Sequence, residues 1–267
     1  MNNEKRAGML EEREKSAQRN SLGLSDPSLA VERIPSLDLI KWLAFITMFI
    51  DHLRFISPQL GWCFYLGRIS FPCFCFLIAS HMQRKLDGDA SSKKIIMYLS
   101  WLSVFFIISE YPYRLFIVNA KSYNVLLTLF LSVLLIGVVT NKSRIIKALC
   151  IPVILAAVLL GHKVMYGLTG VLLPLAILLT LRHGVKLIAL PLALAMVTNI
   201  NIQKILDAGS IHLSILLAMS LASAGLLIAF FVHTNVDAKK TPKINRWGYF
   251  IYPIHFFVFY AIKTQVG

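Results

Sequence analysis

Long apolar runs recur along the chain from Leu37 to the C-terminus, and each is close to the length that crosses a lipid bilayer. Short polar, basic or Pro-containing stretches separate these runs. The pattern predicts an all-α polytopic membrane helix bundle with about nine transmembrane helices, surrounded by the bilayer. The predicted helices cover residues 37–56, 62–82, 95–111, 123–140, 145–160, 168–181, a run that ends near 198, 211–232 and 247–262.

The first 36 residues differ from the rest of the chain. They mix acidic and basic side chains and contain no apolar segment of the kind that forms the core of a secretory signal. We predict a polar, disordered cytosolic tail over residues 1–36 and a transmembrane domain over residues 37–267.

Composition supports this division, since 57% of the residues are hydrophobic and the mean hydropathy is +0.69. The net charge of +14 would favour nucleic-acid binding in a soluble protein. Here the basic residues cluster in short loops between apolar runs, so we interpret them as topology signals and expect no nucleic-acid partner. The tail and the loops after the second, fourth, sixth and eighth predicted helices hold most of the 27 Lys and Arg residues. The N-terminus is therefore predicted to be cytosolic and, with nine spans, the C-terminus periplasmic.

The cysteines give no sign of a metal site or disulfide. Cys73 and Cys75 lie two residues apart on a predicted helix and so point to different faces, and we expect them, with Cys63 and Cys150, in the membrane core. The sequence also lacks a Walker loop, a dinucleotide fingerprint, HExxH and a paired CxxC. Nucleotide hydrolysis and zinc chemistry therefore have no support.

Ionisable side chains in the first two predicted helices are the main functional signal: Asp51, His52 and Arg68. At about 1.5 Å per residue His52 lies ~22 Å beyond Leu37, within a hydrocarbon layer ~30 Å thick. Ionisable groups at that depth are costly and usually functional, although an isolated histidine often only hydrogen-bonds helices together. The adjacent Asp51 and His52 favour the functional interpretation.

These three residue types can support group transfer. A neutral imidazole can take a proton from an attacking amine or hydroxyl near neutral pH, and a nearby carboxylate can fix its tautomer. Asp51 could instead pair with Arg54 or with Arg68. Arg68 could stabilise an oxyanion, hold Asp51, or extend to the membrane surface.

With the N-terminus cytosolic, His52 is predicted to lie in the outer half of the membrane. Further polar residues are predicted on that outer side. Glu110 and Arg114 are spaced for an ion pair, with Pro112 expected to interrupt the helix between them. Asn124 and Tyr166, like Tyr252, could hydrogen-bond a substrate carbonyl or lie at the interface. Two other histidines, His212 and His255, also fall in or next to predicted helices. We interpret one of them as a residue that only forms a hydrogen bond between helices.

Six segments between residues 38 and 263 read DLIKWLAFITMFIDHL, GRISFPCFCFLIA, SEYPYRLF, NVLLTLFL, YGLTGVLLPLAI and YFIYPIHFFVFYAIK. In this order and spacing they resemble the TraX family of conjugative pilin acetylases. The resemblance implies an integral inner-membrane enzyme that acetylates the N-terminus of a pilin subunit, with acetyl-CoA as donor. It places Asp51, His52 and Arg68 at the centre, with Glu110, Asn124 and Tyr166 as supporting positions, and makes residues 37–267 an acyltransferase domain.

Joined to the topology, the resemblance gives a hypothesis about the donor. Basic residues at the predicted cytosolic face would attract the phosphates of acetyl-CoA: Arg84, Lys85, Lys93, Lys94, Lys239, Lys240 and Lys243. The pantetheine arm would reach between helices toward His52, while the pilin amine approaches from the other face. His52 would act as a general base or form an acetyl-histidine intermediate, and the sequence leaves both routes open.

Three alternatives remain at this point. One is a membrane O-acyltransferase that acts on a sugar or lipid hydroxyl with the same donor. Another is a proton-coupled transporter, because intramembrane Asp, His and Arg also mark ion pathways. The third is a non-catalytic scaffold for pilus assembly. The sequence makes no prediction of the oligomeric state.

Overall fold

A computed structural model describes residues 33–86, 91–199, 213–245 and 247–266. The chain divides into two units, Met1–Ile34 and Pro35–Gly267, and every helix described below belongs to the second unit. The predicted tail, residues 1–36, lies almost wholly outside the described residues, as does His212.

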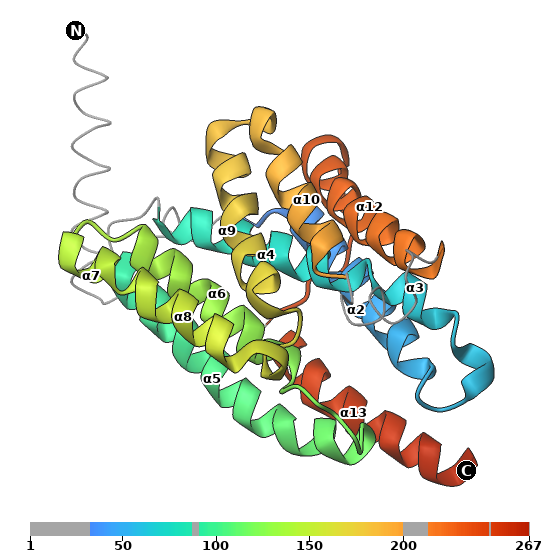
Figure 1. Cartoon of the computed structure of the whole chain (residues 1–267). Helices are drawn as coiled ribbons and strands as arrows, with labels where there is room; N and C mark the ends of the chain where they lie inside the picture. Colours follow the sequence, from blue (N-terminus) through green and yellow to red (C-terminus); the bar gives the residue numbers. More distant parts are fainter. Residues whose placement is uncertain (1–32, 87–90, 200–212, 246, 267) are drawn as a thin grey trace, which may run out of the picture. The chain divides into compact units, whose positions relative to one another are not determined.

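The described part of the chain is all helical, as predicted (Figure 1). The α-helices are α2 (Pro35–Leu53), α3 (Cys63–Gly67), α4 (Ser70–Leu86), α5 (Ser91–Phe116), α6 (Val125–Val139), α7 (Arg144–Ala148), α8 (Cys150–Leu160), α9 (Gly167–His183), α10 (Ala189–Val197), α12 (Leu213–Asn235) and α13 (Gly248–Val266). Short 3-10 turns, η2 (Pro58–Leu60), η3 (Gly161–Lys163) and η4 (Val185–Leu187), lie in the connections. Each predicted apolar run corresponds to one of these helices or to an adjacent pair.

Two predicted helices are each divided in two, for the same reason. Proline lacks a backbone N–H and its ring clashes with the carbonyl four residues before it. Pro72 therefore disrupts the helix at Arg68, where α3 gives way to α4, and Pro152 disrupts it at Ala148, where α7 ends. The break before Pro72 places a site residue, Arg68, between two helices.

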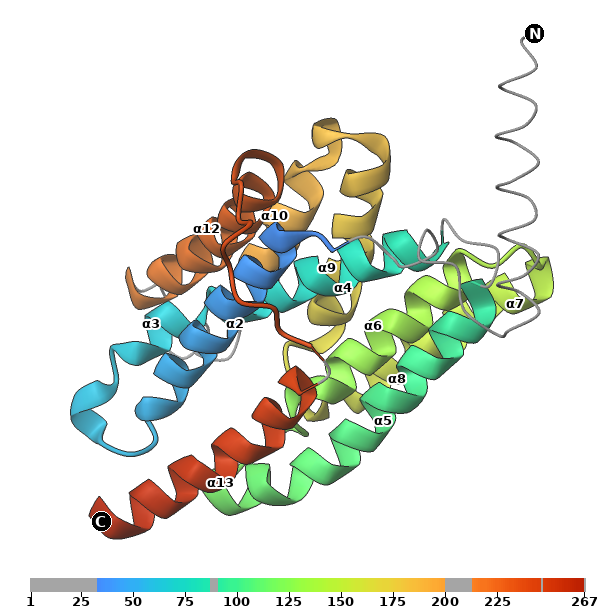
Figure 2. The same ribbon diagram turned by 180° about the vertical axis from the view of Figure 1, so that it is seen from behind.

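The expectation that Pro112 interrupts a helix is wrong, because α5 continues through Pro112 to Phe116. A proline inside a helix costs about 3 kcal/mol, which tertiary packing can offset. Here α13 packs along α5, and α6 packs against it from another side (Figure 2). These contacts hold the last turn of α5 in place beyond the proline.

Three described segments are long and apolar enough to cross a membrane: Cys63–Leu86, Lys93–Phe116 and Leu213–Asn235. Apolar helices of this length indicate a membrane protein. Other helices, such as the 15-residue α6, are apolar but shorter than a ~30 Å hydrocarbon layer requires at about 1.5 Å per residue. The helical fold is thus confirmed, and three spans meet the length and apolarity criteria.

Helix α4 is the central element of the bundle. It packs against α2, α9 and α12, and 72% of an apolar 18-residue stretch within Cys63–Leu86 is buried, compared with 28% of the corresponding stretch within Lys93–Phe116. Cys73 and Cys75 of α4 are free and buried, as expected of core residues. Helix α12 approaches so closely that a Cβ on Gly225 would lie 2.8 Å from Cα of Ile69. Helix α12 is thus tightly packed against the break between α3 and α4, where Ile69 lies.

Candidate functional site

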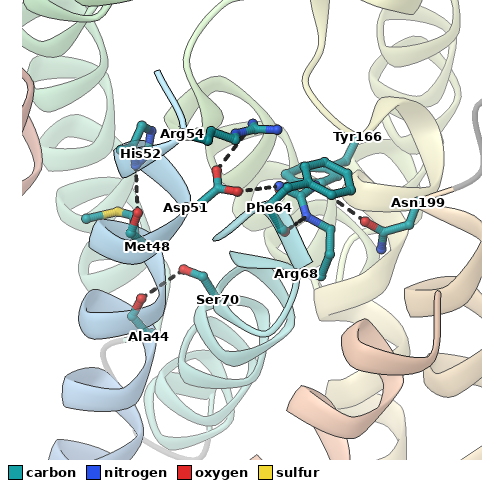
Figure 3. A network of polar contacts seen from close by, with 10 residues as sticks. All are labelled: Ala44, Met48, Asp51, His52, Arg54, Phe64, Arg68, Ser70, Tyr166 and Asn199. Atoms are coloured by element: carbon teal, nitrogen blue, oxygen red, sulfur yellow. Dashed lines mark hydrogen bonds and ion pairs between the residues drawn. The ribbon is translucent and has the colours of Figure 1, made fainter. Parts of the chain in front are cut away.

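The last turn of α2 carries Asp51 and His52, and the two side chains project to different sides of the helix (Figure 3). Adjacent residues on an α-helix point about 100° apart, so this divergence follows from helix geometry. Asp51 faces α3 and Arg68, whereas His52 faces α13. The carboxylate and the imidazole therefore have separate partners.

Asp51 is held by two arginines. Its Oδ1 accepts a hydrogen bond from Nη2 of Arg68 at 3.1 Å, and its Oδ2 accepts one from Arg54 at 3.4 Å. The Asp51–Arg68 pair is largely buried, with about a tenth of each side chain exposed. A Cβ on Gly67 would overlap the Asp51 carboxylate, so only glycine fits beside this pair. Both pairings considered for Asp51 are present at the same time.

Arg68 links Asp51 to segments far away in sequence. Its Nη1 donates to the hydroxyl of Tyr166 at 3.5 Å and to Oδ1 of Asn199 at 3.4 Å, and its Nε donates to the carbonyl of Phe64 at 3.2 Å (Figure 3). The guanidinium also lies 4.2 Å from the centroid of the Phe64 ring. A guanidinium has five N–H groups, so with Asp51 four are engaged by described residues. Arg68 is thus a fixed cation held from several directions.

Tyr166 has an unusual backbone conformation. Its φ of 66° lies in the left-handed region, which non-glycine residues adopt at a cost of about 1–3 kcal/mol. Its ring stacks on Phe71 with centroids 3.9 Å apart, and a Cβ on Gly170 would lie 2.6 Å from Cβ of Tyr166. The turn therefore fixes the tyrosine so that its hydroxyl meets Arg68.

The environment of His52 fixes its tautomer. Nδ1 lies 2.7 Å from the carbonyl of Met48, which can only accept, so Nδ1 carries the proton and Nε2 has the lone pair. The Met48 carbonyl thus fixes the His52 tautomer, a role that the sequence suggested for a nearby carboxylate. The His52 ring packs among aromatic rings, with centroids 5.0 Å from His255, 5.2 Å from Phe256 and 6.1 Å from Phe116.

His255 is a buried neighbour of His52 that the sequence singled out only as a possible packing residue. Nδ1 of His255 lies 3.2 Å from the carbonyl of Ile251 in its own helix, and Nε2 has no hydrogen-bond partner within the described part of the chain. The described bond therefore lies within α13. Because His212 lies outside the described residues, the interpretation that one of the two histidines hydrogen-bonds helices together stays a prediction. What joins His255 to α2 is ring packing against Phe49 and His52.

A cavity of about 430 Å³ opens beside these residues, and we call it the charged cavity. Its described wall residues include Asp51, His52, Arg54, Arg68 and Lys121, together with Tyr113, Tyr166 and Tyr252. Among the described lining residues, three cationic side chains face one carboxylate, so this part of the wall has a positive surplus. Nothing in the sequence pattern distinguished Asn199 or Lys121 from ordinary polar residues at the ends of apolar runs, and their place became visible only in the fold.

Glu110, Arg114 and Asn124 form a second network that does not line the charged cavity. Oε1 of Glu110 accepts from Nε of Arg114 at 2.7 Å, and Oε2 accepts from the backbone and side-chain nitrogens of Asn124 at 3.0 and 2.8 Å. Asn124 also caps α6 by accepting from the Leu126 N–H, and Arg114 donates to the carbonyl of Ala120 at 2.6 Å. The network joins α5 to α6 and shapes the segment before α6, from which Lys121 reaches the cavity.

A further cavity of about 310 Å³, which we call the apolar cavity, lies toward the other ends of the same helices. Of the seven basic residues predicted to bind acetyl-CoA, Arg84 lines this cavity. Nζ of Lys85 donates to the carbonyl of Lys94 at 2.9 Å, which joins the end of α4 to the start of α5. Lys239 pairs with Asp237 at 3.0 Å on an exposed surface. Among the residues described, no group of three or more His, Cys, Asp and Glu side chains is arranged to hold a metal ion.

Fold and site together define a helical membrane protein with an internal charged site made by helix ends. The chain matches the model of the family described as TraX protein over residues 36–263, and it belongs to the TraX family. No curated protein and no solved structure shows significant similarity to it. Family membership is consistent with a pilin-modifying role in conjugation.

Proposed function

We propose that this chain is an inner-membrane N-acetyltransferase that transfers acetyl from acetyl-CoA to the N-terminal amine of a conjugative pilin subunit. The observation that carries the proposal is His52, whose Nδ1 is bound to the Met48 carbonyl and whose ring lines the charged cavity. A histidine with a fixed tautomer and a free Nε2 lone pair is suited to take a proton from an attacking amine.

In the direct route the amine nitrogen bonds to the thioester carbonyl carbon, and the carbon–sulfur bond breaks. The amine proton passes to Nε2 of His52 and then to the departing thiolate, so the products are the acetylated chain and CoA. The alternative route begins with Nε2 attacking the same carbonyl carbon, which breaks the carbon–sulfur bond, releases the CoA thiolate and forms acetyl-histidine. The amine then attacks the acetyl carbon, the bond to Nε2 breaks, and the amine proton passes through Nε2 to the thiolate. Both routes use the same nitrogen.

The charges of the cavity support the choice of an amine. Among the described lining residues Arg54, Arg68 and Lys121 outnumber Asp51, and a positive surplus disfavours an ammonium ion and favours the neutral, nucleophilic amine. The fixed guanidinium of Arg68 is also a source of positive potential for the oxyanion that forms at the carbonyl.

We further propose the orientation that the loop charges predict, with the N-terminus cytosolic and the C-terminus periplasmic. The charged cavity would then open toward the periplasm, where a pilin amine is exposed after leader removal. Acetyl-CoA would approach from the cytosolic ends of the helices.

The test uses the full chain in lipid nanodiscs with deuterium-labelled acetyl-CoA and a pilin peptide with a free N-terminus. We expect mass spectrometry to find one labelled acetyl group on the N-terminal amine, and a His52→Ala variant to transfer about 10²–10⁴-fold more slowly. His233→Ala serves as the matched control, because His233 lies in α12 and does not line the charged cavity.

Three results would separate the alternatives. Labelled protein in the absence of peptide supports the acetyl-histidine route. Acetylation of a sugar or lipid hydroxyl, with none on the peptide, would replace the N-acetyltransferase by an O-acyltransferase. Full transfer by a folded His52→Ala variant would remove His52 from the mechanism.

A further inference from the structure

The charged cavity and the apolar cavity lie end to end along the same helices. On α2 the apolar cavity is lined as far as Phe45 and the charged cavity begins at Met48. The same succession occurs on α4 and α13. Both cavities are lined by Phe74 of α4, Val125 of α6 and Tyr252 of α13, and we call these three residues the septum.

The end of the apolar cavity away from the septum is basic. Lys41 and Arg84 line it there. Nζ of Lys41 is fixed by Oδ1 of Asp38 at 2.9 Å and by the carbonyl of Ile244 at 3.4 Å. From Phe74 to Arg84 the cavity follows ten residues of α4, which at about 1.5 Å per residue is ~15 Å. The cavity is therefore a slot with cations at one end and the septum at the other.

The walls between these ends are not purely hydrocarbon. Leu77, Leu102 and Leu126 make apolar surface, while Tyr98 and Asn245 add groups that can hydrogen-bond. A saturated lipid tail has no donor or acceptor that could bond to such groups, whereas a chain that alternates methylene and amide units matches both the apolar and the hydrogen-bonding surface. Phosphates at the end of that chain match the cations.

We propose that the apolar cavity binds the phosphopantetheine arm of an acyl-CoA, with its phosphates at Lys41 and Arg84 and its thioester against the septum. This inference rests on the proposed function, because it supplies the donor side of that reaction. The arm then lies along the helices, and its acyl carbonyl points toward the cavity that holds His52.

Tyr252 is the septum residue that connects the two sides. It is buried, and its ring lies 5.3 Å from His255 and 5.2 Å from Phe256. Phe256 in turn packs on His52 at 5.2 Å. The acyl group passes between Tyr252 and Phe74 to reach the charged cavity.

The experiment measures equilibrium binding of acetyl-CoA to the full chain in nanodiscs, without any acceptor. In Leu102→Trp a larger side chain occupies the slot, and the matched control is Val104→Trp, because Val104 lies on the same helix but 46% exposed. We expect the affinity for acetyl-CoA to fall by at least about tenfold in Leu102→Trp and to be unchanged in Val104→Trp. Arg84→Gln, which adds no bulk, should weaken acetyl-CoA binding but leave binding of phosphate-free acetyl-pantetheine unchanged.

Equal affinity for acetyl-CoA in Leu102→Trp and Val104→Trp, with both folded, would overturn the proposal. A phospholipid held in the slot that acetyl-CoA does not displace would overturn it as well. Should Leu102→Trp fail to fold, Arg84→Gln decides alone: loss of affinity for acetyl-CoA but not acetyl-pantetheine supports the site, and unchanged affinity refutes it.

The two proposals fail in different ways. A chain that acetylates the pilin peptide while Leu102→Trp binds acetyl-CoA normally keeps its function and loses this donor site. A chain whose acetyl-CoA binding is blocked by Leu102→Trp, but which never acetylates the peptide, keeps the donor site and loses the pilin as acceptor.

Discussion

The carboxylate of Asp51 lies 3.1 Å from Nη2 of Arg68, although Asp51 lies in the last turn of α2 and Arg68 in the break between α3 and α4. Both side chains are largely buried, so each neutralises a charge that would otherwise be costly at that depth. The pair ties the end of α2 to the network that includes Tyr166 and Asn199.

Breaking the buried pair should cost more than removing it. We expect Asp51→Asn or Arg68→Met alone to lower the free energy of unfolding by about 3–5 kcal/mol. Asp51→Asn leaves the buried Arg68 without its anion, and Arg68→Met leaves Asp51 with the longer contact to Arg54 at 3.4 Å. The double variant should recover part of that loss. Denaturant unfolding in detergent measures the cycle, and strictly additive losses would show that the two side chains do not interact.

Gly67→Ala should disturb the same pair through the backbone. The new methyl group would overlap the Asp51 carboxylate, so we expect a loss of about 1–3 kcal/mol in stability and a strong reduction of acetyl transfer. Gly61→Ala is the matched control, because its nearest contact would be 3.3 Å and its φ of −54° suits alanine. Thermal unfolding and transfer rates are compared, and equal behaviour of the two variants would contradict the close contact.

His255→Phe should separate packing from chemistry. The described contacts of His255 across the helices are with rings, and its buried Nε2 has no described hydrogen-bond partner. Phenylalanine keeps the ring and removes the unsatisfied nitrogen, so stability should be unchanged or rise by up to about 1–3 kcal/mol. Acetyl transfer should stay within a few-fold of wild type. A folded variant with a large loss of transfer would instead mean that His255 exchanges a proton with His52.

Glu110→Gln should weaken the fold more than the chemistry. Glu110 accepts from Arg114 and Asn124 but does not line the charged cavity. Removing its charge leaves Arg114 without its anion, and we expect a lower unfolding temperature with near-normal transfer per folded molecule. Ser103→Ala on the same helix is the control, since Ser103 donates only to the carbonyl of Leu99. A loss of transfer at full stability would place Glu110 in the mechanism.

The positions of the termini can be tested independently of any activity. A reporter fused after Gly267 should read as periplasmic and one fused before Met1 as cytosolic, because the basic loops favour that orientation. Two reporters on the same side would mean an even number of spans. The proposed approach of donor and acceptor from opposite faces would then have to be revised around the measured topology.

The sequence by itself determined the helical fold and the residues worth attention. Apolar length and proline positions are local properties, so the runs around α2, α5, α9 and α13 could be placed to within a few residues. The cost of burying charge is also local, and it singled out Asp51, His52 and Arg68. Pro112 was misjudged because packing by α6 and α13, which the local rule ignores, holds the helix together.

Only the tertiary structure decided which groups meet. Arg68 hydrogen-bonds to Tyr166 and Asn199, which lie 98 and 131 residues after it in the sequence. No local sequence pattern predicts contacts between residues so far apart. The Met48 carbonyl, and not Asp51, bonds Nδ1 of His52, because adjacent residues on α2 face different neighbours. The two cavities and the septum at Tyr252 arise from helices packed side by side, so they exist only once the bundle has formed.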